Sequence, residues 1–173
     1  AATMGAAING YTLCVVAGAV PLLSTQFGLS TLEKALVISL NVVGAMAGGI
    51  VGGFLADAAG RKPGLAFCGA AFGLSAMMMA LAPSFTILLA GRFIAGLGTG
   101  VSGVVNPIYL SEVAPPSLRG TLVTANEILL TVGCLFALGV SYLFKDATNG
   151  WRLMLGGAGP PSILLLLTLP LVP

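Results

Sequence analysis

Residues 31–56 read TLEKALVISLNVVGAMAGGIVGGFLA, an apolar run whose only charged residues, Glu33 and Lys34, stand near its start. A helix that crosses the hydrocarbon core of a bilayer, about 30 Å thick, needs about 20 predominantly apolar residues. The run exceeds that length and lacks the regular alternation of polar and apolar residues that is typical of a half-buried strand. It therefore predicts a transmembrane helix.

The composition of the whole chain agrees with this prediction. Of 173 residues, 7 are Lys or Arg and 5 are Asp or Glu, so 7% are charged, against about 25% in soluble domains. The mean hydropathy of +1.07 excludes soluble and disordered classes, and a net charge of +2 gives no basic surface for nucleic acid. The absence of histidine removes His-dependent catalysis and the commonest metal ligand. We expect a polytopic membrane protein that is not an enzyme and needs no cofactor or metal.

Charged residues and turn signals divide the chain into six apolar runs, each long enough to span. Ser30 and Glu33 have the spacing of a capping box, Pro63 suits a first helical turn, and Ser84 is a candidate N-cap. The glycines and prolines of residues 156–161 predict a kink within the last run. The expected spans are Met4–Phe27, Thr31–Ala56, Pro63–Ala82, Phe85–Ile108, Ser117–Phe144 and Trp151–Pro170.

Glycines are frequent, 25 in all, and those of the second run are regularly spaced. Gly44, Gly48 and Gly52 recur every four residues, so they share one face of a helix. Small residues on one face let a neighbouring backbone approach closely. The pattern is compatible both with tight static packing and with helices that slide or rock.

The three cysteines, Cys14, Cys68 and Cys134, each fall inside an apolar run. The preferred interpretation is that they are small buried hydrophobic residues. Because their number is odd, they cannot all be paired in a disulfide framework within one chain.

Two charged residues lie deep inside apolar runs. Arg92 is about seven residues from the start of its run, ~10 Å, and Glu127 is about eight residues beyond Arg119, ~12 Å. Because the two runs are antiparallel, both residues are expected near the middle of the membrane. Ionisable groups at such depth normally face a cavity or a partner. They can pair directly, through water, or through a ligand.

Glu127 also belongs to a polar stripe. Residues at three- and four-residue spacing share one helical face, and here they are Gly120, Thr124, Glu127, Thr131 and Cys134. Asn9 and Thr12 form a shorter stripe in the first run. For the threonines, hydrogen bonding between helices is an equal alternative to a functional role. For Glu127 we favour function, because a carboxylate is costly within a membrane.

Several motifs occur together, in order, along the chain. Gly53-xxx-Asp57-xx-Gly60-Arg61-Lys62 resembles the loop signature of the major facilitator superfamily. Residues 91–100, GRFIAGLGTG, then 107–112, PIYLSE, and 151–156, WRLMLG, resemble its sugar-porter branch. The resemblance covers nearly the whole chain.

The resemblance implies an all-α membrane protein, in which six transmembrane helices form one major facilitator bundle of two three-helix inverted repeats. The repeats are expected at about residues 1–82 and 83–173, in one domain. This corresponds to the N-terminal half of a twelve-span transporter, so the C-terminal half is expected to be absent from the chain.

The first, third and fifth connections between spans hold three Lys or Arg residues, and the second and fourth also hold three. Their distribution therefore does not decide which connections face the cytoplasm. The resemblance places the Asp57–Lys62 and Glu112–Arg119 connections in the cytoplasm. It also implies a charge network that helps to close the inward side. The expected members of this cytoplasmic gate network are Asp57, Gly60, Arg61, Lys62, Glu112 and Arg119.

The family's sugar site carries over only in part. Thr12 stands where family members often have an Asp that carries the coupling proton, and Arg92 matches the Arg that pairs with that Asp. Glu127 stands where the family commonly has a sugar-binding Gln. We expect Glu127 to replace the missing acid and to carry the proton, with Arg92 as its electrostatic counterweight. The expected substrate-binding residues are Asn9, Thr12, Glu127, Thr131 and Cys134.

The resemblance implies transport of a monosaccharide (hexose, pentose or polyol) by alternating access, with proton-coupled symport favoured over an uncoupled facilitator. A non-transporting sugar sensor or scaffold with the same fold is the alternative from another class. The expected partners are sugar, protons, lipid and a second six-helix bundle, which can be a missing half, a separate chain or a second copy in a homodimer. The plasma membrane is preferred to an organelle membrane.

Overall fold

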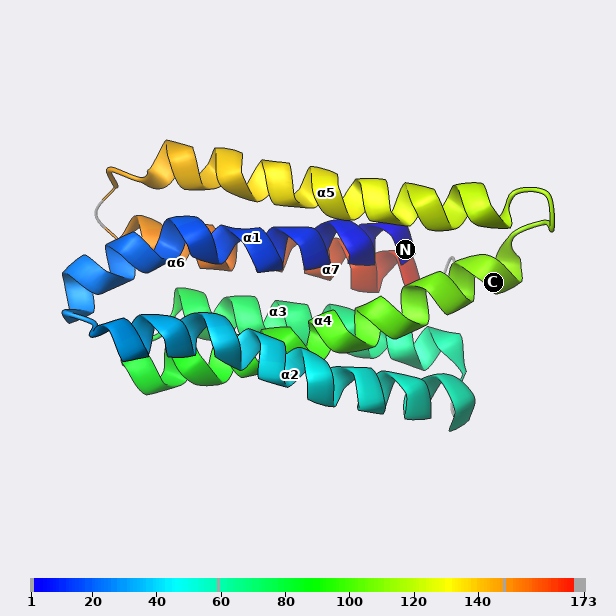
Figure 1. Ribbon diagram of the computed structural model, residues 1–173, viewed down its shortest axis with the longest axis horizontal. Helices are drawn as coiled ribbons and strands as arrows, with labels where there is room; N and C mark the ends of the chain where they lie inside the picture. The colour runs from blue at the N-terminus through cyan, green and yellow to red at the C-terminus, as the bar shows by residue number, and fades with distance from the viewer. Residues whose placement is uncertain (1, 59, 148, 170–173) are drawn as a thin grey trace.

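A computed structural model describes residues 2–58, 60–147 and 149–169, which are almost entirely helical. The helices lie lengthwise, side by side, in one bundle (Figure 1). In these ranges they are α1 (Ala2–Phe27), α2 (Thr31–Ala58), α3 (Arg61–Ala80), α4 (Phe85–Val113), α5 (Arg119–Phe144), α6 (Gly150–Gly156) and α7 (Gly159–Thr168). The helices α1 to α5 are each long and apolar enough to cross a membrane. Together α6 and α7 occupy the sixth predicted span.

The helix ends follow the local signals in most places. At the start of α2 the Ser30 backbone N–H donates to Glu33 Oε2 (2.8 Å) and the Glu33 N–H donates to Ser30 Oγ (3.3 Å), so the capping box is confirmed. Ser84 precedes α4 as its N-cap residue, but its side chain makes no capping hydrogen bond. The last helix separates into two pieces between Gly156 and Gly159, where the sequence predicted a kink.

Most helix ends lie within two residues of the predicted ones, and the ends near two prolines are the most informative. The helix α4 continues past Pro107 to Val113 instead of ending at Ile108, because a proline can bend a membrane helix without ending it. The helix α3 begins at Arg61, before Pro63, so that proline lies in the first turn as predicted.

Glycines bring α2 and α4 into backbone contact. A Cβ added at Gly44 or Gly48 would collide with backbone atoms of α4, and one at Gly52 would lie 2.9 Å from Val101 Cα. In the opposite direction, Gly96 and Gly100 have no room for a Cβ against the backbone of α2. The glycine face therefore packs closely against α4, and whether the helices also slide stays open.

A second pair, α1 and α5, is packed in the same way. Gly10 lies against the carbonyl group of Leu130, and Gly133 lies against that of Ala7. Both close pairs join a helix from residues 1–82 to one from residues 83–173. The boundary between the proposed repeats stays a prediction.

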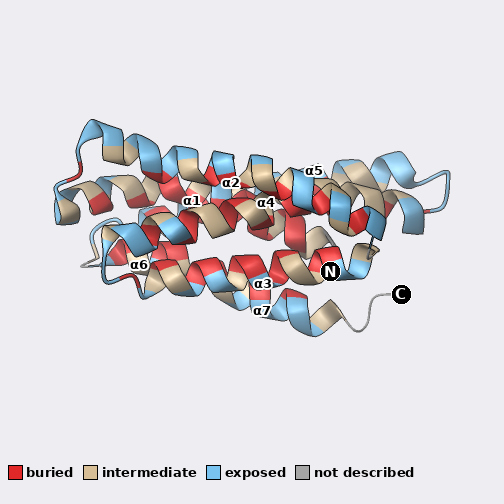
Figure 2. Ribbon diagram, turned by 90° about the horizontal axis from the view of Figure 1, so that it is seen from below, coloured by how far each residue is buried: buried red, intermediate tan, exposed pale blue. Residues whose placement is uncertain are grey.

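Burial is uneven among the helices. The buried hydrophobic core includes Trp151, Phe72 and Leu23, each with almost no exposed surface. In contrast, α2 and α5 are the least buried of the five long helices, and each carries an exposed face (Figure 2). They form opposite edges of the bundle in Figure 1. Their exposed side chains therefore meet lipid or another part of a larger assembly.

The backbone contact predicts opposite results at two adjacent glycines. We expect Gly48→Ala to lower the melting temperature of the detergent-purified chain, since its Cβ would meet the Leu97 backbone and overpacking costs about 1–3 kcal/mol. Gly49→Ala adds the same methyl group where nothing lies within 4 Å, and should melt at or slightly above the wild-type temperature. An equal fall in the melting temperature of both variants would show that the close contact at Gly48 does not determine stability.

Candidate functional site

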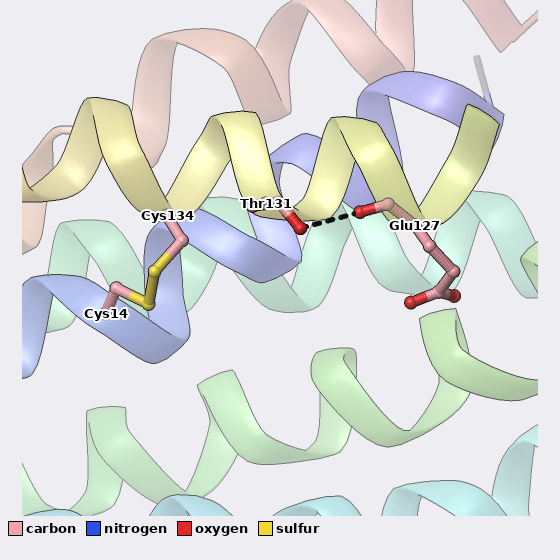
Figure 3. The surroundings of a disulfide bond; sticks show 4 residues. All are labelled: Cys14, Glu127, Thr131 and Cys134. Atoms are coloured by element: carbon pink, nitrogen blue, oxygen red, sulfur yellow. Dashed lines mark hydrogen bonds between the residues drawn. A yellow bond between two sulfur atoms is a disulfide. The ribbon is translucent and has the colours of Figure 1, made fainter. Parts of the chain in front are cut away.

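The polar stripe of α5 lies on the surface of the bundle. Glu127 and Thr131 are exposed and Cys134 is half-buried, and their side chains project from the same side of α5 (Figure 3). The Thr131 hydroxyl donates to the Glu127 backbone carbonyl oxygen (3.0 Å). Within the described ranges the Glu127 carboxylate has no hydrogen-bond or ion-pair partner. The stripe therefore offers a free carboxylate beside a hydroxyl that can still accept a hydrogen bond.

The two residues predicted to bind sugar from α1 lie inside the bundle. Asn9 is 6% exposed and Thr12 is 2% exposed. The Thr12 hydroxyl donates to the Ile8 backbone carbonyl oxygen (2.9 Å), whereas Asn9 Oδ1 is buried without a partner among the described residues. Neither side chain belongs to the exposed face that carries Glu127. Their contact with a sugar stays a prediction.

Arg92 is enclosed among three helices and is 1% exposed. Its Nε donates to the Val37 carbonyl oxygen of α2 (3.1 Å), and its Nη1 donates to the Thr12 carbonyl oxygen of α1 (3.4 Å). In the described part of the chain, the one ion pair joins Arg61 to Glu112, so Arg92 and Glu127 do not pair directly here. Backbone dipoles instead compensate the buried cation.

The cysteine interpretation was wrong for two residues. Cys14 of α1 and Cys134 of α5 form a disulfide with 5.2 Å between their Cα atoms. The glycine contacts between α1 and α5 bring the backbones within the distance that a disulfide spans. The sequence analysis missed Cys14 as a neighbour of the candidate site, although Gly10 and Gly133 lie within one helical turn of the two cysteines. Cys68 is free and buried, as predicted.

The predicted gate residues cluster at one end of the bundle, and the structure joins some of them. Arg61 Nη2 lies 2.6 Å from Glu112 Oε1, and its Nη1 donates to the Ala56 carbonyl oxygen (2.6 Å). This arginine therefore ties the start of α3 to the ends of α2 and α4. Gly60 before it has φ +89°, in the left-handed region that favours glycine, which permits the short turn.

The other gate residues make fewer contacts. Arg119 Nε donates to the Ala114 carbonyl oxygen at the long distance of 3.5 Å. Asp57 and Lys62 are exposed, and neither has an ion-pair partner within the described ranges. Their role in a gate stays a prediction.

Comparison with known proteins identifies the family. The family model described as "Sugar (and other) transporter" matches residues 1–173. The chain belongs to this transporter family. The major facilitator resemblance is thereby confirmed, and the members of this family are transporters and not enzymes.

Similar curated proteins include several transporters. The chain is 38% identical over 170 residues to the putative metabolite transport protein YwtG of Bacillus subtilis, covering 98% of this chain and 37% of that protein. It is 38% identical to the mouse solute carrier family 2, facilitated glucose transporter member 10, covering 98% and 32%. It is 39% identical to the human proton myo-inositol cotransporter, covering 93% and 25%. The chain thus spans about a third of the length of these relatives.

Solved structures agree on the fold. The inward-open xylose transporter XylE of E. coli matches with a TM-score of 0.89 at 26% identity, covering 99% of this chain and 47% of that one. The proton:xylose symporter XylE bound to 6-bromo-6-deoxy-D-glucose matches with a TM-score of 0.92 at 26% identity, covering 99% and 43%. The expected all-α six-span bundle is therefore confirmed, and the protein is an integral, multi-pass membrane protein.

The Arg61–Glu112 pair predicts a charge-swap rescue. Arg61→Glu would place two carboxylates together, and we expect the detergent-purified chain to melt at a lower temperature, since a partly exposed pair is worth up to about 1 kcal/mol. Adding Glu112→Arg should restore most of the lost melting temperature. Lys62→Glu makes the same charge change next to Arg61 and should lower the melting temperature less. Failure of the double variant to recover would show that the pair does not stabilise this end of the bundle.

Proposed function

We propose that the chain forms one half of a monosaccharide transporter, which works by alternating access together with a second six-helix bundle. The observation that carries the proposal is Glu127 on α5, beside Thr131, which is exposed and has no partner among the described residues. The family and fold of the chain are those of sugar transporters. The proposed substrate is a hexose, a pentose or a polyol. The names of similar proteins, which mention glucose, inositol and xylose, support this range.

A second bundle is part of the proposal because Glu127 lies within a helix long enough to span the membrane. A carboxylate facing lipid costs at least a few kcal/mol, and a facing bundle would replace lipid with a polar cavity. The covering bundle is a C-terminal half, a separate chain or a second copy of this chain. A homodimer with its two-fold axis along the membrane normal would reproduce the relation between the two halves of major facilitator transporters.

For the mechanism we favour proton-coupled symport. Glu127 would accept a hydrogen bond from a sugar hydroxyl and would also bind the coupling proton, since a carboxylate can do both. Arg92 would oppose that protonation from within the bundle as a fixed positive charge.

We propose that the transporter is located in the plasma membrane.

Two observations support alternative functions, an uncoupled facilitator and a sugar sensor or scaffold, which the test below distinguishes. Thr12 cannot titrate where related symporters carry an acid, which favours an uncoupled facilitator. The chain by itself offers only one wall of a cavity, which suits a sugar sensor or scaffold that binds without transport.

Replacement of Glu127 tests the coupling. In proteoliposomes that contain the chain with a C-terminal half and are given labelled glucose, xylose or myo-inositol, Glu127→Gln should abolish the stimulation of uptake by an inward proton gradient, because the amide cannot carry a proton but still forms hydrogen bonds. The matched control is Asp146→Asn, which removes one exposed carboxylate just beyond the end of α5 and should leave the stimulation unchanged.

The possible results separate the alternatives. Unchanged proton-coupled uptake in Glu127→Gln would disprove the proposed role of this residue. Wild-type uptake that is insensitive to an uncoupler would identify a facilitator. Sugar binding without uptake, when the chain is reconstituted alone and with a C-terminal half, would identify a sensor.

A further inference from the structure

The disulfide between Cys14 and Cys134 lies in the wall of the proposed sugar site. Cys134 follows Glu127 and Thr131 on the same side of α5 (Figure 3), and both cysteines are half-buried. Part of each cysteine is therefore open to a small reagent that enters from this side of α5. The bond joins residues 120 positions apart in sequence, so it links α1 to α5.

The bundle does not need this bond to hold α1 and α5 together. Gly10 contacts the backbone of Leu130, and Gly133 contacts the backbone of Ala7, both on the N-terminal side of the disulfide in each helix. Beyond the disulfide, Gly18 lies against the Ser141 side chain. None of these contacts involves a sulfur atom. We therefore expect reduction to leave the helix pair packed and to change the site locally.

We propose that the Cys14–Cys134 pair is a reversible thiol–disulfide site that regulates sugar binding. The inference rests on the proposed function, since it concerns the same α5 face. In the oxidised form the two sulfur atoms are bonded and stay close together. In the reduced form they must stand at van der Waals separation. Without its covalent partner the Cys134 side chain is free to change rotamer on the side of α5 that also carries Thr131.

The exchange is chemically balanced with a small thiol of the glutathione class. Its thiolate attacks one cysteine sulfur, forms a mixed disulfide and expels the other cysteine as a thiolate. A second small thiolate then attacks the small-molecule sulfur, which releases the remaining cysteine and forms the small-molecule disulfide. The protein gains two electrons and two protons, and two thiols are oxidised. Oxidised glutathione reverses the sequence.

The structure predicts that reduction weakens sugar binding. The released Cys134 side chain must be ordered again when sugar binds, and we expect the affinity for labelled xylose, glucose or myo-inositol to fall by about fivefold, since immobilising one such side chain costs about 1 kcal/mol. The chain in nanodiscs, alone and with a C-terminal half, is titrated with sugar after treatment with dithiothreitol or oxidised glutathione. A maleimide-PEG gel shift counts the free thiols in each state.

Three variants identify the cause. Cys14→Ala/Cys134→Ala has no sulfur to exchange, so its sugar affinity should be the same after dithiothreitol and after oxidised glutathione. Cys14→Ser leaves Cys134 without its partner and should bind like the reduced protein after treatment with dithiothreitol. Cys68→Ala removes the buried free cysteine and should keep the full redox response.

The outcomes distinguish the inference from the function on which it rests. Equal sugar affinity in the two redox states, with a gel shift that confirms reduction, overturns the inference and leaves the transporter proposal intact. Three accessible thiols before any reductant is added overturn it as well. Absence of sugar binding in both states, with and without a C-terminal half, overturns the proposed function, and with it the regulation of a sugar site.

Discussion

The structure depends on contact between helix backbones. Where α2 meets α4, and where α1 meets α5, glycines replace side chains, and the carbonyl groups of one helix lie directly against the neighbouring chain. Such close approach is how membrane helices associate when lipid removes the hydrophobic drive between them. The approach of α2 to α4 also brings the Val37 carbonyl oxygen within reach of Arg92. The approach of α1 to α5 brings Cys14 and Cys134 within the distance that a disulfide spans.

The two charges in the middle of the chain are accommodated in different ways. Arg92 is enclosed, and neutral carbonyl groups from two helices accept its hydrogen bonds, so its cost is met within the bundle. Glu127 is left on the surface without a partner in the described part of the chain. The burial of Arg92 is therefore compensated within this one bundle. The environment of the Glu127 carboxylate depends instead on what faces α5.

Local signals predicted most of the fold and less of the site. Span lengths, the Ser30–Glu33 capping box and the break near Gly157 depend on residues close in sequence, and the structure has all of them. Thr12 and Thr131 illustrate the limit. Both lie in polar stripes at helical spacing, yet one is buried and the other exposed, because spacing defines a face and not what covers it. The disulfide was missed for the same reason: it requires knowing that the faces of Gly10 and Gly133 meet.

The backbone contacts also limit how the sequence can change. When two side chains fill a space, enlargement of one can be offset by a smaller residue at the other, and such pairs drift together. At Gly48 the opposing group is the Leu97 carbonyl, which every amino acid carries and no substitution makes smaller. Second-site suppressors of a larger residue here will therefore not be found at the contacted position. A suppressor substitution must instead shift a whole helix. At these glycines, therefore, no pair of contacting residues can change together to compensate each other.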